Sequence, residues 1–169
     1  TRENREGVLY SLNNEIITAL HMDPIEKKPL YHFKPGSLIL SVGSFGCNFN
    51  CGFCQNHTIA LGNDYDQIYA TPEMLVNSAR KLDINIGIAY TYNEPTVFYE
   101  LMYDTAKAIK KVGLDNVLVS NGFINPAPLK ELIPFLDAAN IDLKAYDNRF
   151  YKKYVRGRLE EVKQSIKIL

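Results

Sequence analysis

Two patterns of apolar residues alternate along the chain from Gly36 onward. Short runs of Val, Ile and Leu are typical of buried strands, and longer segments with apolar residues at every third or fourth position are typical of amphipathic helices. Boundary residues support this division, because Thr71-Pro72 is suited to begin a helix and Gly113 to end one. The predicted strands cover residues 37–42, 84–91, 117–119 and 139–144, and the predicted helices cover 72–82, 95–112, 126–136 and 158–169.

This order of elements predicts parallel strands joined by right-handed helical crossovers, in an α/β fold. Four strands are too few for a complete barrel. Polar residues follow each strand, where α/β proteins build their sites. In the strand 84–91, Ile84, Ile86 and Ile88 are expected on one face, and in the strand 139–144, Ile141 and Leu143. We therefore expect residues 37–169 to form a partial TIM-like (β/α) barrel.

Residues 1–36 are interpreted as an N-terminal lead-in. Apolar runs at 8–12 and 15–20 flank Asn13-Asn14, which predicts a hairpin, and three prolines predict a loop-rich segment over 21–36. The chain begins with Thr1, and its last predicted helix has no stop signal. We therefore expect it to be a C-terminally incomplete piece of a longer protein.

Composition fits one globular domain, since 46% of the 169 residues are apolar and 22% are charged. The net charge of zero gives no electrostatic reason to expect nucleic acid or an anionic membrane as a partner. The sequence has no secretory signal pattern and no apolar run near the ~18 residues of a membrane span. Three clustered cysteines, an odd number, indicate a reducing compartment, so we expect a cytoplasmic location.

The cysteines Cys47, Cys51 and Cys54 form a C-x3-C-x2-C pattern in a loop rich in Gly and Asn. A helical stripe has the same spacing, but the Asn and Gly residues between the cysteines disfavour a helix. A structural zinc site needs four ligands, and His57 could be the fourth. Iron–sulfur clusters also usually take four protein ligands, so three thiolates around a 4Fe–4S cluster would leave one iron open. The residues alone leave both kinds of site possible.

A C-x3-C-x2-C loop after the first strand of the predicted barrel, with Phe53 before the last cysteine, resembles the radical SAM superfamily. The resemblance implies that Cys47, Cys51 and Cys54 hold a 4Fe–4S cluster whose open iron chelates S-adenosylmethionine. One electron then cleaves this cofactor to methionine and a 5′-deoxyadenosyl radical, which abstracts hydrogen from a substrate. Phe53 would flank the adenine.

Three further stretches resemble cofactor-binding parts of this superfamily. Tyr92-Asn93-Glu94 stands where the family has a Gly-Gly-Glu-like stretch, with Tyr92 and Asn93 at the glycine positions, which implies that Glu94 accepts from the cofactor amine. Ser120-Asn121 begins a stretch similar to the Thr-Asn-Gly-Phe of glycyl-radical-enzyme activases, near the cofactor ribose and carboxylate. Asp142 and Lys144 match their Asp-Leu-Lys, with Lys144 paired to the carboxylate. The structural alternatives are a helix cap, a turn and a strand end. Val119 replaces an activase Asp that helps to bind a monovalent cation.

Within the superfamily, the stretches 46–48, 54–56 and 90–95 and parts of 2–10 are most similar to AmmeMemoRadiSam-system enzymes, which are described as pyruvate formate-lyase activating enzyme homologues. The resemblance implies a radical SAM oxidoreductase that uses an electron donor such as flavodoxin or ferredoxin and acts on a protein or a small molecule. The competing hypotheses are a non-catalytic zinc- or iron–sulfur-binding structural module and an electron-transfer module.

Overall fold

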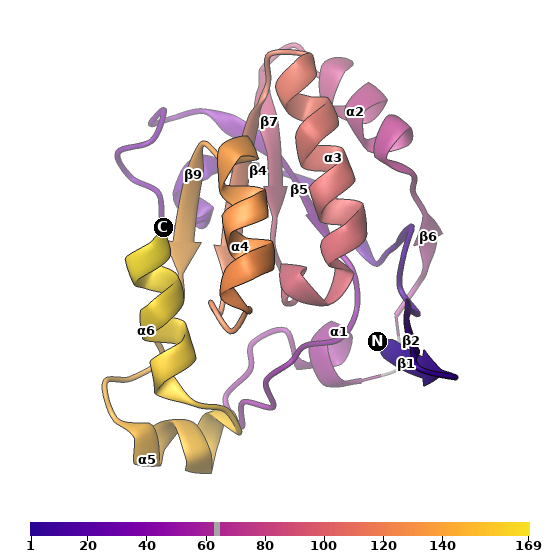
Figure 1. The fold of residues 1–169 in the computed structure, drawn as a ribbon. Helices are drawn as coiled ribbons and strands as arrows, with labels where there is room; N and C mark the ends of the chain where they lie inside the picture. The colour runs from indigo at the N-terminus through magenta and orange to yellow at the C-terminus, as the bar shows by residue number, and fades with distance from the viewer. Residues whose placement is uncertain (63–64) are drawn as a thin grey trace.

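The computed structural model describes residues 1–62 and 65–169 and is built on a five-stranded sheet (Figure 1). Its strand order is β4-β5-β7-β8-β9. The last four strands are parallel to one another, which confirms the predicted α/β fold and its partial barrel. The strands of this sheet are β4 (Ala19–Pro24), β5 (Leu38–Gly43), β7 (Asn85–Tyr90), β8 (Asp115–Ser120) and β9 (Ala138–Ile141).

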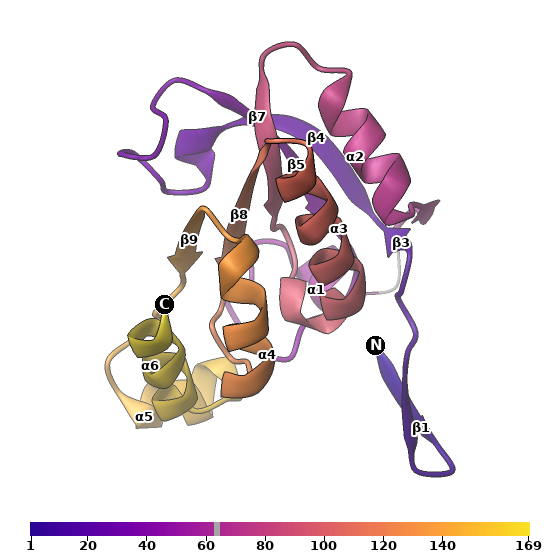
Figure 2. The ribbon, with the colours of Figure 1, turned by 45° about the horizontal axis from the view of Figure 1, so that its top comes forward.

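Three helices cover one face of this sheet (Figures 1 and 2): α2 (Pro72–Arg80), α3 (Tyr99–Lys111) and α4 (Pro126–Leu132). They confirm three predicted helices, although Pro95–Phe98 and Ile133–Phe135 form 3-10 turns. Thr71 caps α2 as expected, since its Oγ1 accepts from Met74 N at 3.2 Å. The main core lies between these helices and the sheet and includes Ile88, Tyr90, Leu101, Met102 and Ile109.

The N-terminal lead-in differs from the prediction. The hairpin joins β1 (Arg2–Arg5) to β2 (Val8–Ser11) and turns at Glu6-Gly7, so the hairpin predicted around Asn13-Asn14 is wrong. The run after Asn14 divides into β3 (Ile16–Ile17), which pairs with β6 (Ile68–Tyr69), and β4. Bidentate hydrogen bonds of 2.7 and 2.8 Å from Arg2 to Glu100 hold the hairpin to α3.

The segment predicted as a loop over 21–36 begins instead with the second half of β4, which pairs antiparallel with β5. A 3-10 turn, Ile25–Lys27, follows and places Ile25 against Ile39, Ala89 and Val117 on the sheet face opposite the main core. The lead-in therefore adds a strand to the sheet and covers its second face. The division of the chain at residue 36 stays a prediction.

Strand β7 contains a bulge that overturns the predicted face pattern. In its pairing with β5, Leu38 lies opposite Asn85 and Leu40 lies opposite Ile88, so β7 has one residue more than β5 between these two pairs. Ile88 consequently packs in the main core, while Ile86 packs on the other face. The Oδ1 of Asn85 accepts from Leu40 N at 2.8 Å, which replaces a ladder bond lost at the bulge.

Between β9 and the C-terminal helix lie two elements that the sequence pattern did not predict. Strand β9 ends at Ile141, three residues earlier than expected, and Leu143 is exposed rather than packed on the helix face. Then come α5 (Asn148–Phe150), a π-helix over Tyr151–Val155 and the predicted C-terminal helix α6 (Leu159–Ile168). Within the described residues, no helix is both long and apolar enough to cross a membrane.

Candidate functional site

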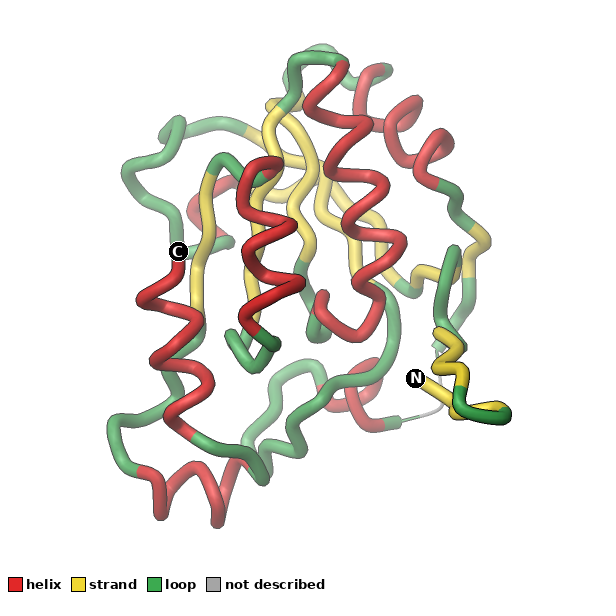
Figure 3. Tube along the Cα trace, in the orientation of Figure 1, coloured by secondary structure: helices red, strands yellow, loops and turns green. Residues whose placement is uncertain are grey.

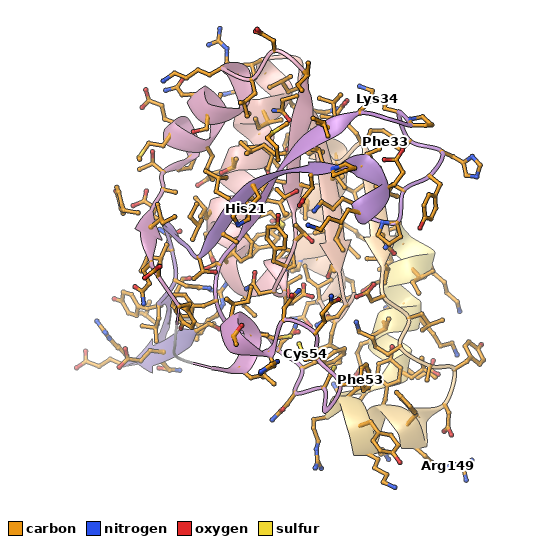
Figure 4. All side chains as sticks on the ribbon, turned by 180° about the vertical axis from the view of Figure 1, so that it is seen from behind. His21, Phe33, Lys34, Phe53, Cys54 and Arg149 are labelled. Atoms are coloured by element: carbon orange, nitrogen blue, oxygen red, sulfur yellow. The ribbon has the colours of Figure 1, made fainter. Side chains whose placement is uncertain are left out.

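A cavity of about 270 Å³ lies at the carboxyl ends of β5, β7, β8 and β9. In Figure 4, Phe53 and Cys54 mark this end of the molecule. All ten side chains predicted as site residues line the cavity, so the expected juxtaposition is found; their individual roles stay predictions. They are Cys47, Cys51, Phe53, Cys54, Asn93, Glu94, Ser120, Asn121, Asp142 and Lys144.

The cysteine loop runs from β5 to α1 (His57–Leu61) and is fixed from two sides (Figure 3). On one side, Asn93 accepts from Ser44 N at 3.0 Å and donates to Gly46 O at 2.9 Å. On the other side, Asn50 N donates to Val155 O and Gly52 N to Tyr154 O, both at 3.0 Å. Asn93 was predicted to bind the cofactor. In the structure its side-chain amide instead forms hydrogen bonds that fix the position of the cysteine loop.

The three thiols lie in one electrostatic environment. Burial above all, together with the charges of Glu94, Cys51 and Cys54, raises the pKa of Cys47 to about 11, although the hydrogen bond from Phe49 N acts in the opposite direction. Burial also raises the pKa of Cys51, although the nearby Lys144 ammonium opposes this. The Cys47 Sγ accepts from Phe49 N at 3.3 Å. Such thiols are protonated at neutral pH and become ligands only when a metal replaces their protons.

The donor set fits an iron–sulfur cluster better than a single zinc ion. Thiolates are the ligands that clusters prefer. Zinc would require four donors within about 2.3 Å of one point. His57, the proposed fourth zinc ligand, is exposed and lies outside the cavity lining.

Glu94 is buried at the end of β7 and links it to the end of β8. Its Oε1 accepts from Ser120 Oγ at 2.8 Å and Thr96 N at 3.0 Å, and its Oε2 accepts from Asn121 N at 2.8 Å. Burial raises the pKa of Glu94, while these donors act in the opposite direction. Since a carboxylate has about four acceptor positions, one position on Oε2 is left for a further donor. Glu94 can therefore cap the helical turn that follows β7 and still offer an acceptor to a molecule in the cavity.

Ser120 and Asn121 are tied to their neighbours. The Ser120 hydroxyl donates to Glu94 and accepts from Gly122 N at 3.0 Å, so it orients the carboxylate. The Asn121 Nδ2 donates to Asn48 Oδ1 at 2.8 Å and lies 3.7 Å from Cys47 Sγ. Asn121 therefore joins β8 to the cysteine loop directly.

Asp142 and Lys144, which follow β9, form an ion pair in the cavity wall, with Lys144 Nζ 2.7 Å from Asp142 Oδ2. Burial alone would lower the pKa of Lys144, but the hydrogen bond and charge of Asp142 raise it. The ammonium keeps two further N–H donors beyond this bond. A cation from the segment after β9 thus lines the same cavity as Glu94, and Phe53, 52% exposed, lines it as well.

Two residues that line the cavity, Asn56 and Tyr92, and one that lies beside it, Asn48, are not among the predicted site residues. Asn48 bridges Asn121 and Phe123 O, and Asn56 donates to Tyr92 O at 2.7 Å. Tyr92 has a φ of +70°, in the left-handed region that glycine adopts without strain. The family's glycine at this position was a signal that the backbone turns here, and in this chain a tyrosine takes that conformation.

Comparisons with known proteins agree with this site. The sequence model of the Radical SAM superfamily matches residues 41–169. The uncharacterized protein MJ0808 of Methanocaldococcus jannaschii is 44% identical over 169 residues, and the match covers 99% of this chain and 50% of that protein. The chain therefore spans half the length of this curated relative.

Two solved structures are similar. The crystal structure of QueE from Escherichia coli has a TM-score of 0.60 at 11% identity, covering 89% of this chain and 67% of that chain. This likeness shows the fold alone. A structure of TYW1 with a lysine-pyruvate adduct bound has a TM-score of 0.46 at 22% identity, covering 75% of this chain and 49% of that chain. With a family match over three quarters of its length, the chain belongs to the radical SAM superfamily.

Proposed function

We propose that this chain is the core of a radical SAM enzyme that holds a 4Fe–4S cluster through Cys47, Cys51 and Cys54 and binds S-adenosylmethionine in the adjoining cavity. The observation that carries the proposal is that three thiols, an acceptor and a cation line one cavity at the carboxyl ends of the parallel strands. When bound, the cluster supplies the electron that cleaves the cofactor reductively and so starts hydrogen abstraction.

The chain's own residues would orient a zwitterion between two walls. The open acceptor position of Glu94 suits an amine, and the two remaining N–H donors of Lys144 suit a carboxylate. The exposed ring of Phe53 offers a face for the adenine. Because Glu94 and Lys144 come from different strands, they would fix both ends of one molecule.

Anaerobic reconstitution tests this proposal. We expect brown protein with about four iron and four sulfide per chain, and formation of 5′-deoxyadenosine when dithionite is added. Cys51→Ala should lose the cluster, because the sequence has only three cysteines. Colourless protein with stoichiometric zinc would refute the proposal and support the structural module.

The finer proposal is an activase-like reaction on a glycyl-radical protein. It is supported by Ser120-Asn121-Gly122-Phe123 and by Asp142-Leu143-Lys144, which line or adjoin the cavity. Electron paramagnetic resonance of a mixture with pyruvate formate-lyase should show a glycyl-radical doublet. Cofactor cleavage without this signal would leave the radical SAM activity intact and reject this substrate. Because Val119 offers no carboxylate, we expect cleavage to be insensitive to replacing potassium by tetramethylammonium.

A further inference from the structure

A basic surface lies beside the cysteine loop, on α5, the π-helix and the turn that follows. Residues 148–159 contain no Asp or Glu, whereas the whole chain has equal numbers of acidic and basic side chains. All five basic side chains of this segment are exposed. We call them the basic surface; they are Arg149, Lys152, Lys153, Arg156 and Arg158.

Most of this positive charge is not neutralised locally. Arg149 lies 3.5 Å from Asp147, and Arg158 lies 2.6 Å from Glu161. In the part of the chain that the structure describes, no carboxylate lies within 4.0 Å of the charged groups of Lys152, Lys153 or Arg156. Three uncompensated cations on one short segment produce a local positive field in a chain of zero net charge.

Aromatic rings stand among these cations and continue to the cavity. The Phe53 and Phe150 ring centroids are 5.8 Å apart, and those of Phe150 and Tyr154 are 5.0 Å apart. Lys153 Nζ lies 4.8 Å from the centre of the Tyr154 ring, and Tyr154 and Phe53 are both exposed. Aromatic and arginine side chains are enriched in protein-binding surfaces, and the lysines add the charge that attracts an acidic partner.

The basic surface is joined to the cysteine loop by the backbone. Two hydrogen bonds of 3.0 Å connect Asn50 to Val155 and Gly52 to Tyr154, and Asn50 and Gly52 flank Cys51. In Figure 4, Arg149 extends outward from the same end of the molecule at which Phe53 and Cys54 lie. A protein bound here would therefore lie close to the three thiols.

We propose that the basic surface docks an acidic one-electron donor protein that reduces the cluster held by Cys47, Cys51 and Cys54. This inference rests on the proposed function, because it supplies the electron that cofactor cleavage consumes. The donor, of the flavodoxin or ferredoxin class, loses one electron and the cluster gains it, with no bond made or broken. Electron transfer weakens steeply with distance, so contact with the cysteine loop favours a redox partner over nucleic acid or a membrane.

The test uses the full reconstituted protein with three cations reversed, Lys152→Glu/Lys153→Glu/Arg156→Glu. The control, Arg80→Glu/Lys81→Glu/Lys111→Glu, makes the same charge change at exposed positions on the ends of α2 and α3, at the opposite end of the sheet (Figure 1). Formation of 5′-deoxyadenosine is measured with reduced flavodoxin, with reduced ferredoxin and with dithionite. Binding of each donor protein to each variant is measured by surface plasmon resonance at low salt, and only the reversed surface should weaken it, at least tenfold. Iron content and circular dichroism check that each variant is folded and loaded.

One of the two donor proteins should support turnover by the parent protein. With that donor at low salt, we expect the reversed surface to lower the rate of cofactor cleavage at least tenfold. The rate of the reversed variant should also no longer fall when salt is added. The dithionite rate should stay within twofold, since a small reductant needs no docking surface, and the control should behave like the parent protein. Equal protein-donor rates in the parent and the reversed variant would overturn the proposal. A parallel loss with dithionite would also overturn it, by placing these cations in cofactor or substrate binding. No cleavage by the parent protein with dithionite would instead refute the proposed function.

A second variant, Lys152→Gln/Lys153→Gln/Arg156→Gln, removes the three charges without reversing them. It should give a smaller loss than charge reversal, and it replaces the reversed variant in the test if that variant is unstable.

Discussion

The hydroxyl of Tyr92 donates a 2.5 Å hydrogen bond to Asp23 Oδ2, and this bond joins the cavity rim to strand β4 across 69 positions of sequence. Asp23 also accepts from Lys27 and Lys28, each at 2.7 Å. Asp23 and Lys28 are buried, and the Lys28 ammonium lies 4.9 Å from the centre of the Tyr92 ring. The N-terminal segment thereby holds a strained cavity residue in place.

Replacing Asp23 by Ala should destabilise the fold by about 3–5 kcal/mol, because it leaves the buried Lys28 ammonium without its counter-charge. Urea denaturation followed by circular dichroism measures this loss. The matched control is Glu3→Ala, which removes a carboxylate from an exposed ion pair with Arg5 and should change stability by less than about 1 kcal/mol. Equal effects of the two substitutions would show that the Asp23 network contributes little.

The same carboxylate predicts a dependence on pH. Burial alone would raise the pKa of Asp23, but hydrogen bonds from Lys27, Lys28 and Tyr92 together lower it below its ordinary value of 3.8. A carboxyl whose pKa is lower in the folded state adds stability above its unfolded pKa and loses it as pH falls below that value. Asp23→Asn should therefore lose less stability than the parent protein between pH 5 and pH 2. Parallel curves of unfolding free energy would contradict this.

Gly87→Ala should destabilise the sheet by about 3 kcal/mol, at the upper end of the cost of overpacking. A Cβ at this bulge position would clash with the backbone oxygen of Asp115. Gly52→Ala is the control, because its Cβ would have no atom within 4 Å. Thermal unfolding should separate the two variants clearly, and similar midpoints would mean that β7 and β8 can move apart at small cost.

Asn93→Ala should loosen the cysteine loop without removing a ligand. Ser44 N and Gly46 O would lose their partners, at about 1 kcal/mol for each hydrogen bond. We expect reconstituted protein to lose iron to a chelator roughly thirtyfold faster, because the two bonds together contribute about 2 kcal/mol. Asn77→Ala, on the exposed surface of α2, should leave the rate unchanged. An unchanged rate in Asn93→Ala would show that the backbone bonds to Val155 and Tyr154 suffice.

Local patterns predicted the parallel strands, their helices and the rim of the site. Those features depend on signals within a few residues, such as the apolar run before Cys47 or Pro95 at a helix start. Parallel strands have their carboxyl ends at the same edge of the sheet, so the polar residues after each strand were predicted to lie close together. This is why Glu94 and Lys144, which come from different strands, were expected in one cavity.

The features that sequence reasoning missed depend on contacts between distant segments. Alternation placed Ile86 and Ile88 on one face, but the bulge at Gly87 depends on the close approach of Asp115. The part of β4 after residue 20 was predicted as a loop because of Pro24, Pro29 and Pro35, yet it pairs with β5 at the edge of the sheet, where proline is tolerated. The π-helix lies among charged residues, and its packing on Phe49 has no local signature.

Lys144→Ala should weaken binding of S-adenosylmethionine by about 1.5–3 kcal/mol, the usual contribution of a charged hydrogen bond. The Lys144 ammonium bonds to Asp142 and lines the cavity. Because Lys144 is not a proposed ligand of the cluster, its substitution should leave the iron content unchanged. Glu94→Gln keeps an oxygen but removes the charge that an amine requires, and it should weaken binding by a similar amount. Isothermal titration calorimetry on anaerobically reconstituted protein measures both affinities, and iron analysis verifies equal cluster loading.

The matched control for this last prediction is Lys163→Ala, which removes a lysine that is also ion-paired, to Glu160 on the surface of α6. Its affinity should equal that of the parent protein, so that a loss in Lys144→Ala reports the position of the charge. The combined variant Glu94→Gln/Lys144→Ala should lose nearly the sum of both effects, since the two groups would bind opposite ends of the cofactor. Unchanged affinity in both single variants would place the cofactor elsewhere. Glu94 would then be the cap of the helix after β7, and Lys144 a strand-end residue paired only with Asp142.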